Sequence, residues 1–251
     1  MVDQPIIDII IPNFNKAKYL DECLNSIINQ TYKKWKIYLI DDNSNDNSSQ
    51  ILKKYEKFEN IKIFNLKENK GPSFCRNFGI KESKSEFLAF MDSDDMWPKD
   101  KLEKQVSNML KNNYNFTYTD FQFFFDDNLK KMKKSNLPLF FDYKKFLSHS
   151  SMSTSSIIIN RKLLENINFK MVNHEDYLFK CDLLKNGSMA FKINETFVYY
   201  RINKDSRSSN KFKSILSLWK INKRYNNLNF FNNLKSIISI SFNSLKKYGW
   251  K

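Results

Sequence analysis

The stretch Phe87-Leu88-Ala89-Phe90-Met91-Asp92-Ser93-Asp94-Asp95 decides the fold, because in it a short apolar run passes directly into a cluster of carboxylates. Such a run is typical of a buried strand. Two further apolar runs, Ile6–Ile11 and Ile37–Ile40, also end in polar residues, which are Pro12–Asn15 and Asp41–Ser44. Ligands of parallel sheets bind beyond the carboxyl ends of the strands. The three polar clusters are therefore predicted to converge on one crevice.

Helical segments separate these strands. An amphipathic helix is predicted where Leu20, Cys23, Leu24, Ile27 and Ile28 recur at intervals of three and four residues, with Asn15 as its N-cap. Further along, the sequence predicts a polar helix around Ile51–Phe58, a strand at Ile61–Leu66, a helix opened by Gly71-Pro72 and a helix from about Lys99 to Asn112. This alternation indicates an α/β fold with a Rossmann-like, mostly parallel sheet flanked by helices.

The second half of the chain is less regular. The sequence predicts a strand pair over Phe116–Phe125, a charged loop over Asp126–Asn136, strands at Ser155–Asn160 and Thr196–Arg201, and a helix over His174–Asn186 closed by Gly187. From about Phe212 onward the chain is expected to be helical and basic. A soft boundary near residue 205 separates this extension from the α/β part.

The composition narrows the classes of partner. The net charge of +15 suggests a polyanion or an anionic membrane surface. Only five of the 42 basic residues are arginine, the side chain best suited to bidentate contacts with bases and phosphates, so no nucleic-acid partner is expected. The alternative is that the abundant lysines only solvate the surface.

The cysteines and the N-terminus bear on the compartment. Cys23, Cys75 and Cys181 are far apart and odd in number, which fits a reducing compartment better than a disulfide framework or a zinc site. The N-terminus lacks the pattern of a signal peptide, and no apolar run approaches the roughly 18 residues that span a bilayer. We therefore expect a soluble, cytoplasmic protein.

The carboxylates Asp92, Asp94 and Asp95 repel one another, and such a cluster usually holds a hard cation. Bound Mg²⁺ or Mn²⁺ can bridge nucleotide phosphates and neutralise a leaving diphosphate. The alternative is a solvated turn whose last aspartate caps the next helix. The position at a strand end, before Met96-Trp97-Pro98, favours the metal.

Three further clusters could carry chemistry. Asp41–Ser44 could accept hydrogen bonds from a base or ribose, or could simply form a turn. The helix start at Gly71-Pro72, with Arg76 nearby, could bind a diphosphate. Glu175 and Asp176 could supply a general base, or could stabilise the start of a helix through its dipole. His174 could be a metal ligand or a structural residue.

With these motifs in order, the sequence resembles the family 2 glycosyltransferases, which have the glycosyltransferase-A fold. The resemblance is carried by Pro12–Asn15, Gln30–Tyr32, Asp41–Ser44, Asn69–Gly71, Cys75–Gly79, Asp92–Asp95, Trp97-Pro98, Lys101–Glu103, Gln105, Glu175-Asp176 and Tyr200-Arg201, over roughly residues 6–203. Each motif is weak alone, whereas the ordered set is specific. It implies an inverting, metal-dependent enzyme of the hexosyltransferase type, commonly in bacterial surface-polysaccharide synthesis.

The resemblance also implies roles for individual residues. Pro12, Phe14 and Asp42 would hold the base, usually uracil, and Asn15 and Asp92 would belong to the same nucleotide site. Arg76 would hold the base or the diphosphate. Asp94 would contact the ribose and share the Mn²⁺ or Mg²⁺ site of this DXD-type motif with Asp95. Asp176 would be the general base on the acceptor hydroxyl, with Glu175 as the fallback.

The implied donor is a nucleoside-diphosphate-sugar, and the implied acceptor is a saccharide or a lipid-linked saccharide. Residues 1–112 would form the nucleotide-sugar-binding half and residues 113–205 the acceptor half of one catalytic domain, followed by a basic helical extension over residues 206–251. Two departures from the family are Asn203, where many relatives carry histidine, and Pro98 directly after Trp97.

Two rival functions predict different sequence features. A metal-dependent nucleotidyltransferase would carry a glycine-rich, basic signature near the N-terminus, where this chain has Pro12–Asn15. A basic nucleic-acid-binding module would carry an arginine-rich face.

The extension suggests a peripheral membrane contact. Phe212, Ile215, Leu216 and Trp219, and then Phe230, Leu234, Ile237, Ile238 and Leu245, lie at helical spacing among lysines. Basic amphipathic helices of this kind can lie in an anionic interface. The alternative is that their apolar faces pack on the catalytic domain.

Overall fold

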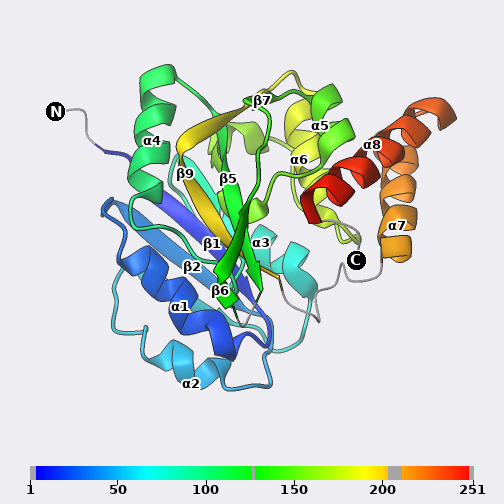
Figure 1. Ribbon diagram of the computed structural model, residues 1–251. Helices are drawn as coiled ribbons and strands as arrows, with labels where there is room; N and C mark the ends of the chain where they lie inside the picture. The colour runs from blue at the N-terminus through cyan, green and yellow to red at the C-terminus, as the bar shows by residue number, and fades with distance from the viewer. Residues whose placement is uncertain (1–3, 126–127, 203–210, 249–251) are drawn as a thin grey trace.

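The protein is described from a computed structural model, in which residues 4–125, 128–202 and 211–248 are placed (Figure 1). The elements run in the order β1 (Ile7–Asn13), α1 (Ala17–Ile28), β2 (Trp35–Asp41), α2 (Ser48–Lys53), β3 (Ile61–Asn65), α3 (Gly71–Glu82), β4 (Phe87–Phe90), α4 (Lys101–Asn112), β5 (Phe116–Phe125), β6 (Asn128–Lys134), β7 (Phe140–Phe141), α5 (Tyr143–His149), β8 (Ile158–Asn160), α6 (Glu175–Lys185), β9 (Ala190–Ile202), α7 (Lys211–Arg224) and α8 (Phe230–Tyr248).

The strands form one nine-stranded sheet, ordered β3-β2-β1-β4-β8-β5-β9-β7, with β6 paired to β5. The first four strands are parallel. Strand β8 then runs antiparallel to both β4 and β5, whereas β5 and β9 are parallel. The predicted α/β class and the parallel first half are thereby confirmed, and each antiparallel pair of the described strands includes a strand from the second half of the chain.

The parallel half is buried on both faces, as the apolar character of its strands requires. In β1 the side chains of Ile9, Ile10 and Ile11 are fully buried. Helix α3 packs closely on this sheet at Gly79, where an added Cβ would lie 2.6 Å from Ile10 Cγ2 and 3.0 Å from Ile40 Cδ1. This glycine therefore sets the distance between helix and sheet.

The start of helix α1 differs from the sequence prediction. The helix begins at Ala17, and its backbone N–H donates to the Asp46 carboxylate at 2.9 Å. Asn15 is not the N-cap, because it lies in the left-handed region with φ of 52° and its Oδ1 accepts from the backbone N–H of Asn45 at 2.9 Å. A carboxylate from the neighbouring loop thus replaces the local cap, a long-range contact that helix periodicity does not reveal.

Two predictions in the second half are also wrong. Residues Phe116–Phe125 form one ten-residue strand rather than a pair, and Asn128–Lys134 form its antiparallel partner β6 rather than a loop. Lysines are common on edge strands because they discourage pairing between molecules, so the charge of this segment disguised it. Strand β9 is longer than predicted, and α5 and β7 were not anticipated.

The C-terminal extension is helical, as predicted, and packs beside the α/β part of the chain (Figure 1). Leu218, Ile221 and Ile237 are buried in this contact. Asn222 fixes it by accepting a hydrogen bond from the Tyr177 hydroxyl of α6 at 2.8 Å. The predicted boundary near residue 205 and the departure at Asn203 lie outside the described residues. None of the helices placed in the structure is long and apolar enough to cross a membrane.

Candidate active site

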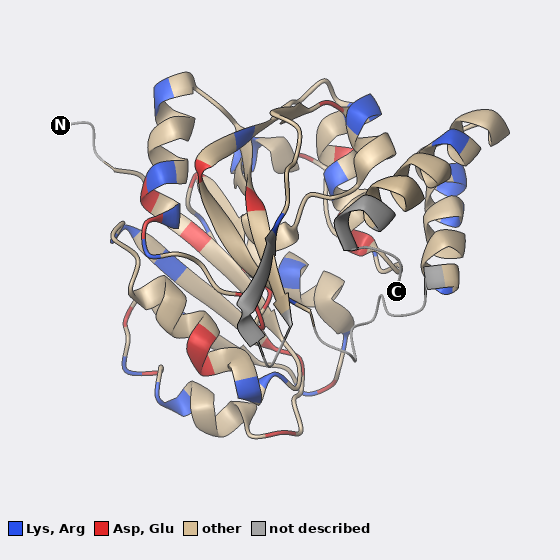
Figure 2. Cartoon of the chain, viewed as in Figure 1, with Lys and Arg blue, Asp and Glu red and all other residues tan. Residues whose placement is uncertain are grey.

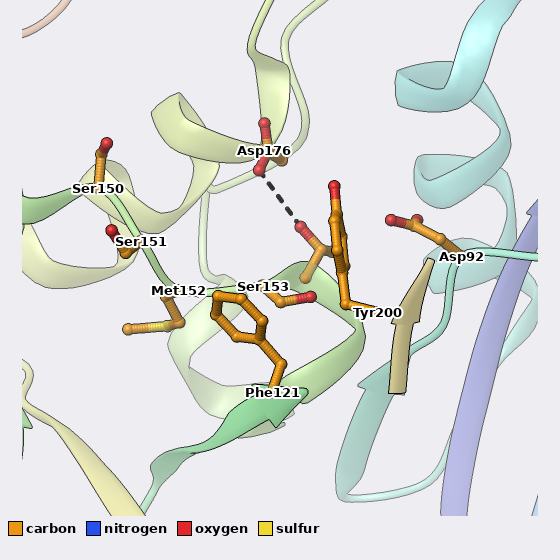
Figure 3. A pocket seen from close by; sticks show the side chains of 9 residues that line it. Asp92, Phe121, Ser150, Ser151, Met152, Ser153, Asp176 and Tyr200 are labelled. Carbon is orange, nitrogen blue, oxygen red and sulfur yellow. Dashed lines mark hydrogen bonds between the residues drawn. The ribbon is translucent and has the colours of Figure 1, made fainter. Parts of the chain in front are cut away.

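A pocket of about 170 Å³ opens beyond the end of β4 and against β5 and β9 (Figure 3). It is lined by Asp92, Phe121, Ser150, Ser151, Met152, Ser153, Thr154, Asp176 and Tyr200. In Figure 3 the carboxyl groups of Asp92 and Asp176 lie on the two sides of the Tyr200 ring. The structure therefore places a carboxylate from each of the two predicted acidic clusters in one pocket.

The two acidic residues at the start of α6 point to different surroundings. Glu175 is buried and accepts a hydrogen bond from Arg76 Nη1 at 3.0 Å. The Asp176 side chain is 37% exposed and lines the pocket. Adjacent residues of a helix do not face the same way, which explains the division. Asp176, and not Glu175, is therefore in a position to meet a substrate hydroxyl.

A buried lysine holds the Asp176 carboxylate. Lys180, one turn further along α6 and only 1% exposed, donates to Asp176 Oδ2 at 2.8 Å and to the Met152 carbonyl at 2.6 Å. Burial raises the pKa of Asp176, but the charge and hydrogen bond of Lys180 outweigh it, so the pKa lies well below its usual range. Asp176 is thus kept ionised, and the sequence prediction missed the residue that does so.

Arg76 links the two acidic clusters. Its guanidinium is buried and donates from Nη2 to Asp92 at 2.8 Å and from Nη1 to Glu175 at 3.0 Å. Burial lowers the pKa of Arg76, but the charges of Asp92 and Glu175 raise it by more, so the net shift of the pKa is upward. Arg76 thereby fixes the residue that follows β4 against the start of α6.

The three carboxylates of the acidic motif differ in exposure. The side chains of Asp92 and Asp94 are 33% and 19% exposed, and Asp94 pairs with Lys16 at 2.6 Å. Asp95 is 1% exposed, and its two oxygens accept from the Ser155 hydroxyl and from the backbone N–H of Arg201 at 3.0 Å. Burial, with Asp94 and Asp92 nearby, raises the pKa of Asp95.

The wall of the pocket comes from a run of hydroxyl residues that the sequence prediction did not single out. The run Ser150-Ser151-Met152-Ser153-Thr154-Ser155-Ser156 joins α5 to β8. Ser155 holds it to the acidic motif, because its hydroxyl accepts from the backbone N–H of Asp92 at 3.0 Å and its carbonyl accepts from Trp97 Nε1 at 2.9 Å. The high density of hydroxyl residues in this run was the feature of the sequence that could have indicated a polar pocket wall.

The predicted nucleotide cluster is organised at the ends of β1 and β2. Asn13 donates to Asp41 at 2.6 Å, which joins the two strand ends. Asp42 is buried, and its carboxylate accepts from the backbone N–H groups of Lys70 at 2.7 Å and Gly71 at 2.8 Å. Asp42 thus anchors the start of α3, while Phe14 is exposed beside the cluster.

The sequence profile described as Glycosyl transferase family 2 matches residues 8–178, more than half of the chain. The chain belongs to glycosyltransferase family 2. The matched region contains the acidic motif, Arg76 and the Glu175-Asp176 pair.

Relatives in bacteria match along nearly the whole chain. WfgD of Escherichia coli, a UDP-Glc:alpha-D-GlcNAc-diphosphoundecaprenol beta-1,3-glucosyltransferase, is 32% identical over 88% of this chain and 86% of its own. TuaG of Bacillus subtilis, a putative teichuronic acid biosynthesis glycosyltransferase, is 29% identical over 97% of this chain and 98% of its own.

Solved structures share the fold at lower identity. Residues 1–349 of Staphylococcus aureus TarS, in complex with UDP-GlcNAc, superpose with a TM-score of 0.71 at 20% identity, covering 96% of this chain and 73% of that one. The mannosyltransferase PcManGT of Pyrobaculum calidifontis, in complex with GDP-Man and Mn²⁺, gives a TM-score of 0.71 at 14% identity, covering 100% and 77%. These likenesses confirm the predicted glycosyltransferase-A type of fold.

The protein's own contribution to a metal site is small. Across residues 4–125, 128–202 and 211–248, no group of three or more His, Cys, Asp and Glu side chains is arranged to hold a metal ion. Mg²⁺ typically takes one or two carboxylates and completes its shell with water and substrate phosphates. The partly exposed Asp92 and Asp94 fit that pattern of ligands, whereas the buried Asp95 has both oxygens engaged in hydrogen bonds.

Proposed function

We propose that this glycosyltransferase moves a sugar from a UDP-linked donor to a lipid-linked saccharide acceptor in polysaccharide synthesis, with inversion at the anomeric carbon. One observation carries the proposal: Asp176, held ionised by Lys180, and Asp92, held by Arg76, line the same pocket. The activity of WfgD and the UDP-GlcNAc bound to TarS support this choice of donor and acceptor.

The base and the leaving group would act from opposite ends of the pocket. The Asp176 carboxylate takes the proton of the acceptor hydroxyl while the new bond forms between that oxygen and the anomeric carbon. The bond from the anomeric carbon to the phosphate oxygen breaks, and the nucleoside diphosphate leaves. Positioned proton transfer of this kind contributes about 10²–10⁴ in rate. Inversion follows because a single displacement attacks the face opposite the leaving group.

The leaving diphosphate would lie beside the acidic motif. We assign the site of a divalent cation to Asp92 and Asp94, which would hold Mn²⁺ or Mg²⁺; the cation would supply positive charge to stabilise the leaving diphosphate. In this assignment Asp95 positions the motif through Ser155 and Arg201 instead of binding the metal. Arg76 positions Asp92 and Glu175, and in this assignment it does not contact the nucleotide base.

The base of the nucleotide would lie at the strand ends of β1 and β2. Phe14 is 43% exposed there and offers an aromatic face for stacking. Pro12, Asn15 and Asp42 belong to the same cluster, in which Asp42 shapes the loop at Gly71. The reaction with a lipid-linked acceptor would take place with the enzyme peripheral to the inner face of the cell membrane.

A screen of nucleotide-sugars tests the proposal. The full chain is incubated with UDP- and GDP-sugars in Mn²⁺ and in EDTA, and release of the nucleoside diphosphate is measured with and without a lipid-diphosphate saccharide. We expect UDP release in Mn²⁺ that the acceptor accelerates. Release of GDP alone would show that the donor is a GDP-sugar and not a UDP-sugar. Release of neither nucleotide would contradict the proposal.

A further inference from the structure

The two C-terminal helices carry most of the net positive charge of the chain. Residues 206–251 contain ten lysines and arginines and no aspartate or glutamate, against a net charge of +15 for the whole sequence. In Figure 2 the described parts of α7 and α8 accordingly show basic residues and no acidic ones. Lys220, Lys223, Arg224 and Lys235 are exposed among them. This end of the molecule therefore attracts a polyanion.

The same helices expose large apolar side chains. Eight of the fifteen exposed large hydrophobic residues in the described parts of the chain lie on α7 and α8: Phe212, Ile215, Leu216, Phe230, Phe231, Leu234, Ile238 and Phe242. Phe231 is 79% exposed and Ile238 is 59% exposed. Clusters of this kind mark interaction sites on soluble domains.

These exposed residues are not left over from packing on the catalytic domain. The inner faces of the helices are already buried there, through Leu218, Ile221 and Ile237. On α8 the exposed Phe231, Ile238 and Phe242 lie about 100–140° around the helix from the buried Ile237, at 100° per residue, so they face away from this contact. Helix α8 therefore carries a wide apolar arc, of which one edge is buried at Ile237 and the rest faces outward.

We propose that this outward face of α7 and α8, here called the C-terminal face, docks the enzyme on an anionic lipid surface. Basic residues beside outward apolar residues match a bilayer interface, where the lysines meet lipid phosphates and the phenylalanines enter the acyl region. A second copy of the chain fits poorly, because two such faces would bring like charges together. The aliphatic residues Leu216, Leu234 and Ile238 fit nucleic acid poorly.

Helix α8, which carries much of the C-terminal face, is joined to the segment that leads into the pocket. On α8, the Ser236 hydroxyl donates to the Leu147 carbonyl of α5 at 2.6 Å and Asn243 donates to the Ser148 carbonyl at 3.0 Å. The next residues, Ser150–Thr154, line the pocket. Docking would thus hold the enzyme where a lipid-linked acceptor lies. This role of the docking rests on the proposed function, whereas the docking itself does not.

Vesicle co-sedimentation of the full chain tests the docking without donor or acceptor. The probes are vesicles of phosphatidylcholine alone and of phosphatidylcholine mixed equally with phosphatidylglycerol. We expect binding to the anionic vesicles only. Lys220→Gln/Lys223→Gln/Arg224→Gln should weaken it about 100-fold, at about 1 kcal/mol for each basic residue, and Phe231→Ser/Ile238→Ser at least about tenfold.

Matched variants elsewhere on the surface should bind like the parent. These are Lys53→Gln/Lys81→Gln/Lys111→Gln for charge and Leu110→Ser/Leu139→Ser for exposed apolar residues. Circular dichroism establishes that every variant is folded, and soluble UDP-sugar hydrolysis should not change in any of them. Equal binding to both kinds of vesicle, equal losses in the control variants, or dimerisation or RNA binding through this face in place of lipid binding would overturn the proposal.

Discussion

Replacing Lys180 with methionine should slow sugar transfer while leaving donor binding intact. Lys180 is buried beneath the pocket and holds the Asp176 carboxylate at 2.8 Å, so its loss removes a charge-assisted hydrogen bond from the proposed base. Hydrogen bonds to charged groups contribute about 1.5–3 kcal/mol. At about 1.4 kcal/mol for each factor of ten, the transfer rate should fall about 10- to 150-fold. The outer side of Asp176 meets solvent, which favours the lower part of this range.

The pH dependence distinguishes this role from a merely structural one. Lys180 lowers the pKa of Asp176, so in the parent the base stays ionised as the pH falls through the usual range of a carboxyl group. Without Lys180, only the charges of Arg76 and His174 still oppose the effect of burial, so the pKa of Asp176 is higher than in the parent. The acidic limb of the rate profile should therefore move to higher pH in Lys180→Met, while the alkaline side stays unchanged.

The assay is steady-state transfer over a range of pH, together with UDP-sugar affinity by calorimetry and thermal unfolding. Lys185→Met is the matched control, since Lys185 lies on the same helix and pairs with Asp182 at 2.7 Å, away from the pocket lining. A Lys180→Met enzyme that is folded, binds donor and transfers sugar with the parental rate and pH profile would refute the reasoning.

Three other perturbations have expected outcomes. Asp94→Asn should lower UDP affinity in Mn²⁺ but not in EDTA, because a carboxylate that acts through a cation matters only when the cation is present; calorimetry in both buffers checks this, and an equal loss in both would contradict it. Asp95→Asn should weaken UDP binding about equally in both buffers, since it disturbs the hydrogen bonds to Ser155 and Arg201. A loss seen only in Mn²⁺ would show that Asp95 is a metal ligand. Gly79→Ala should lower the stability by about 1–3 kcal/mol, since its Cβ would meet Ile10 Cγ2 at 2.6 Å; an unchanged thermal midpoint would show that the helix can move.

The sequence predicted the parts of the fold that depend on local pattern. The parallel strands β1, β2 and β4 are continuous apolar runs, and α1 repeats apolar residues at helical spacing, so both were recognisable. Strand β6 was not, because its lysines resemble a loop and only pairing with β5 makes it a strand. The cap of α1 was missed for a related reason, since Asp46 reaches it from another loop.

The site was predictable to the same extent. Asp92 and Asp176 stood out as members of acidic clusters, and the rule for strand ends placed the first of them in a crevice. Whether Asp176 or Glu175 faces that crevice depends on Arg76, which lies 99 positions away from Glu175 in the chain. Lys180 belongs to no recognisable sequence motif, and only its hydrogen bonds to Asp176 and to the Met152 carbonyl reveal its role.

Asp176→Asn tests the central claim most directly, because the amide keeps the shape of the carboxylate and removes its basicity. Sugar transfer from the UDP-sugar to a lipid-linked acceptor and donor affinity are measured side by side for the parent, Asp176→Asn and Glu175→Gln. The account predicts that Asp176→Asn lowers transfer about 10²–10⁴-fold while donor affinity stays within about two- to threefold, and that Glu175→Gln is milder. Transfer by Asp176→Asn at the parental rate, or a loss of donor binding in place of transfer, would contradict it.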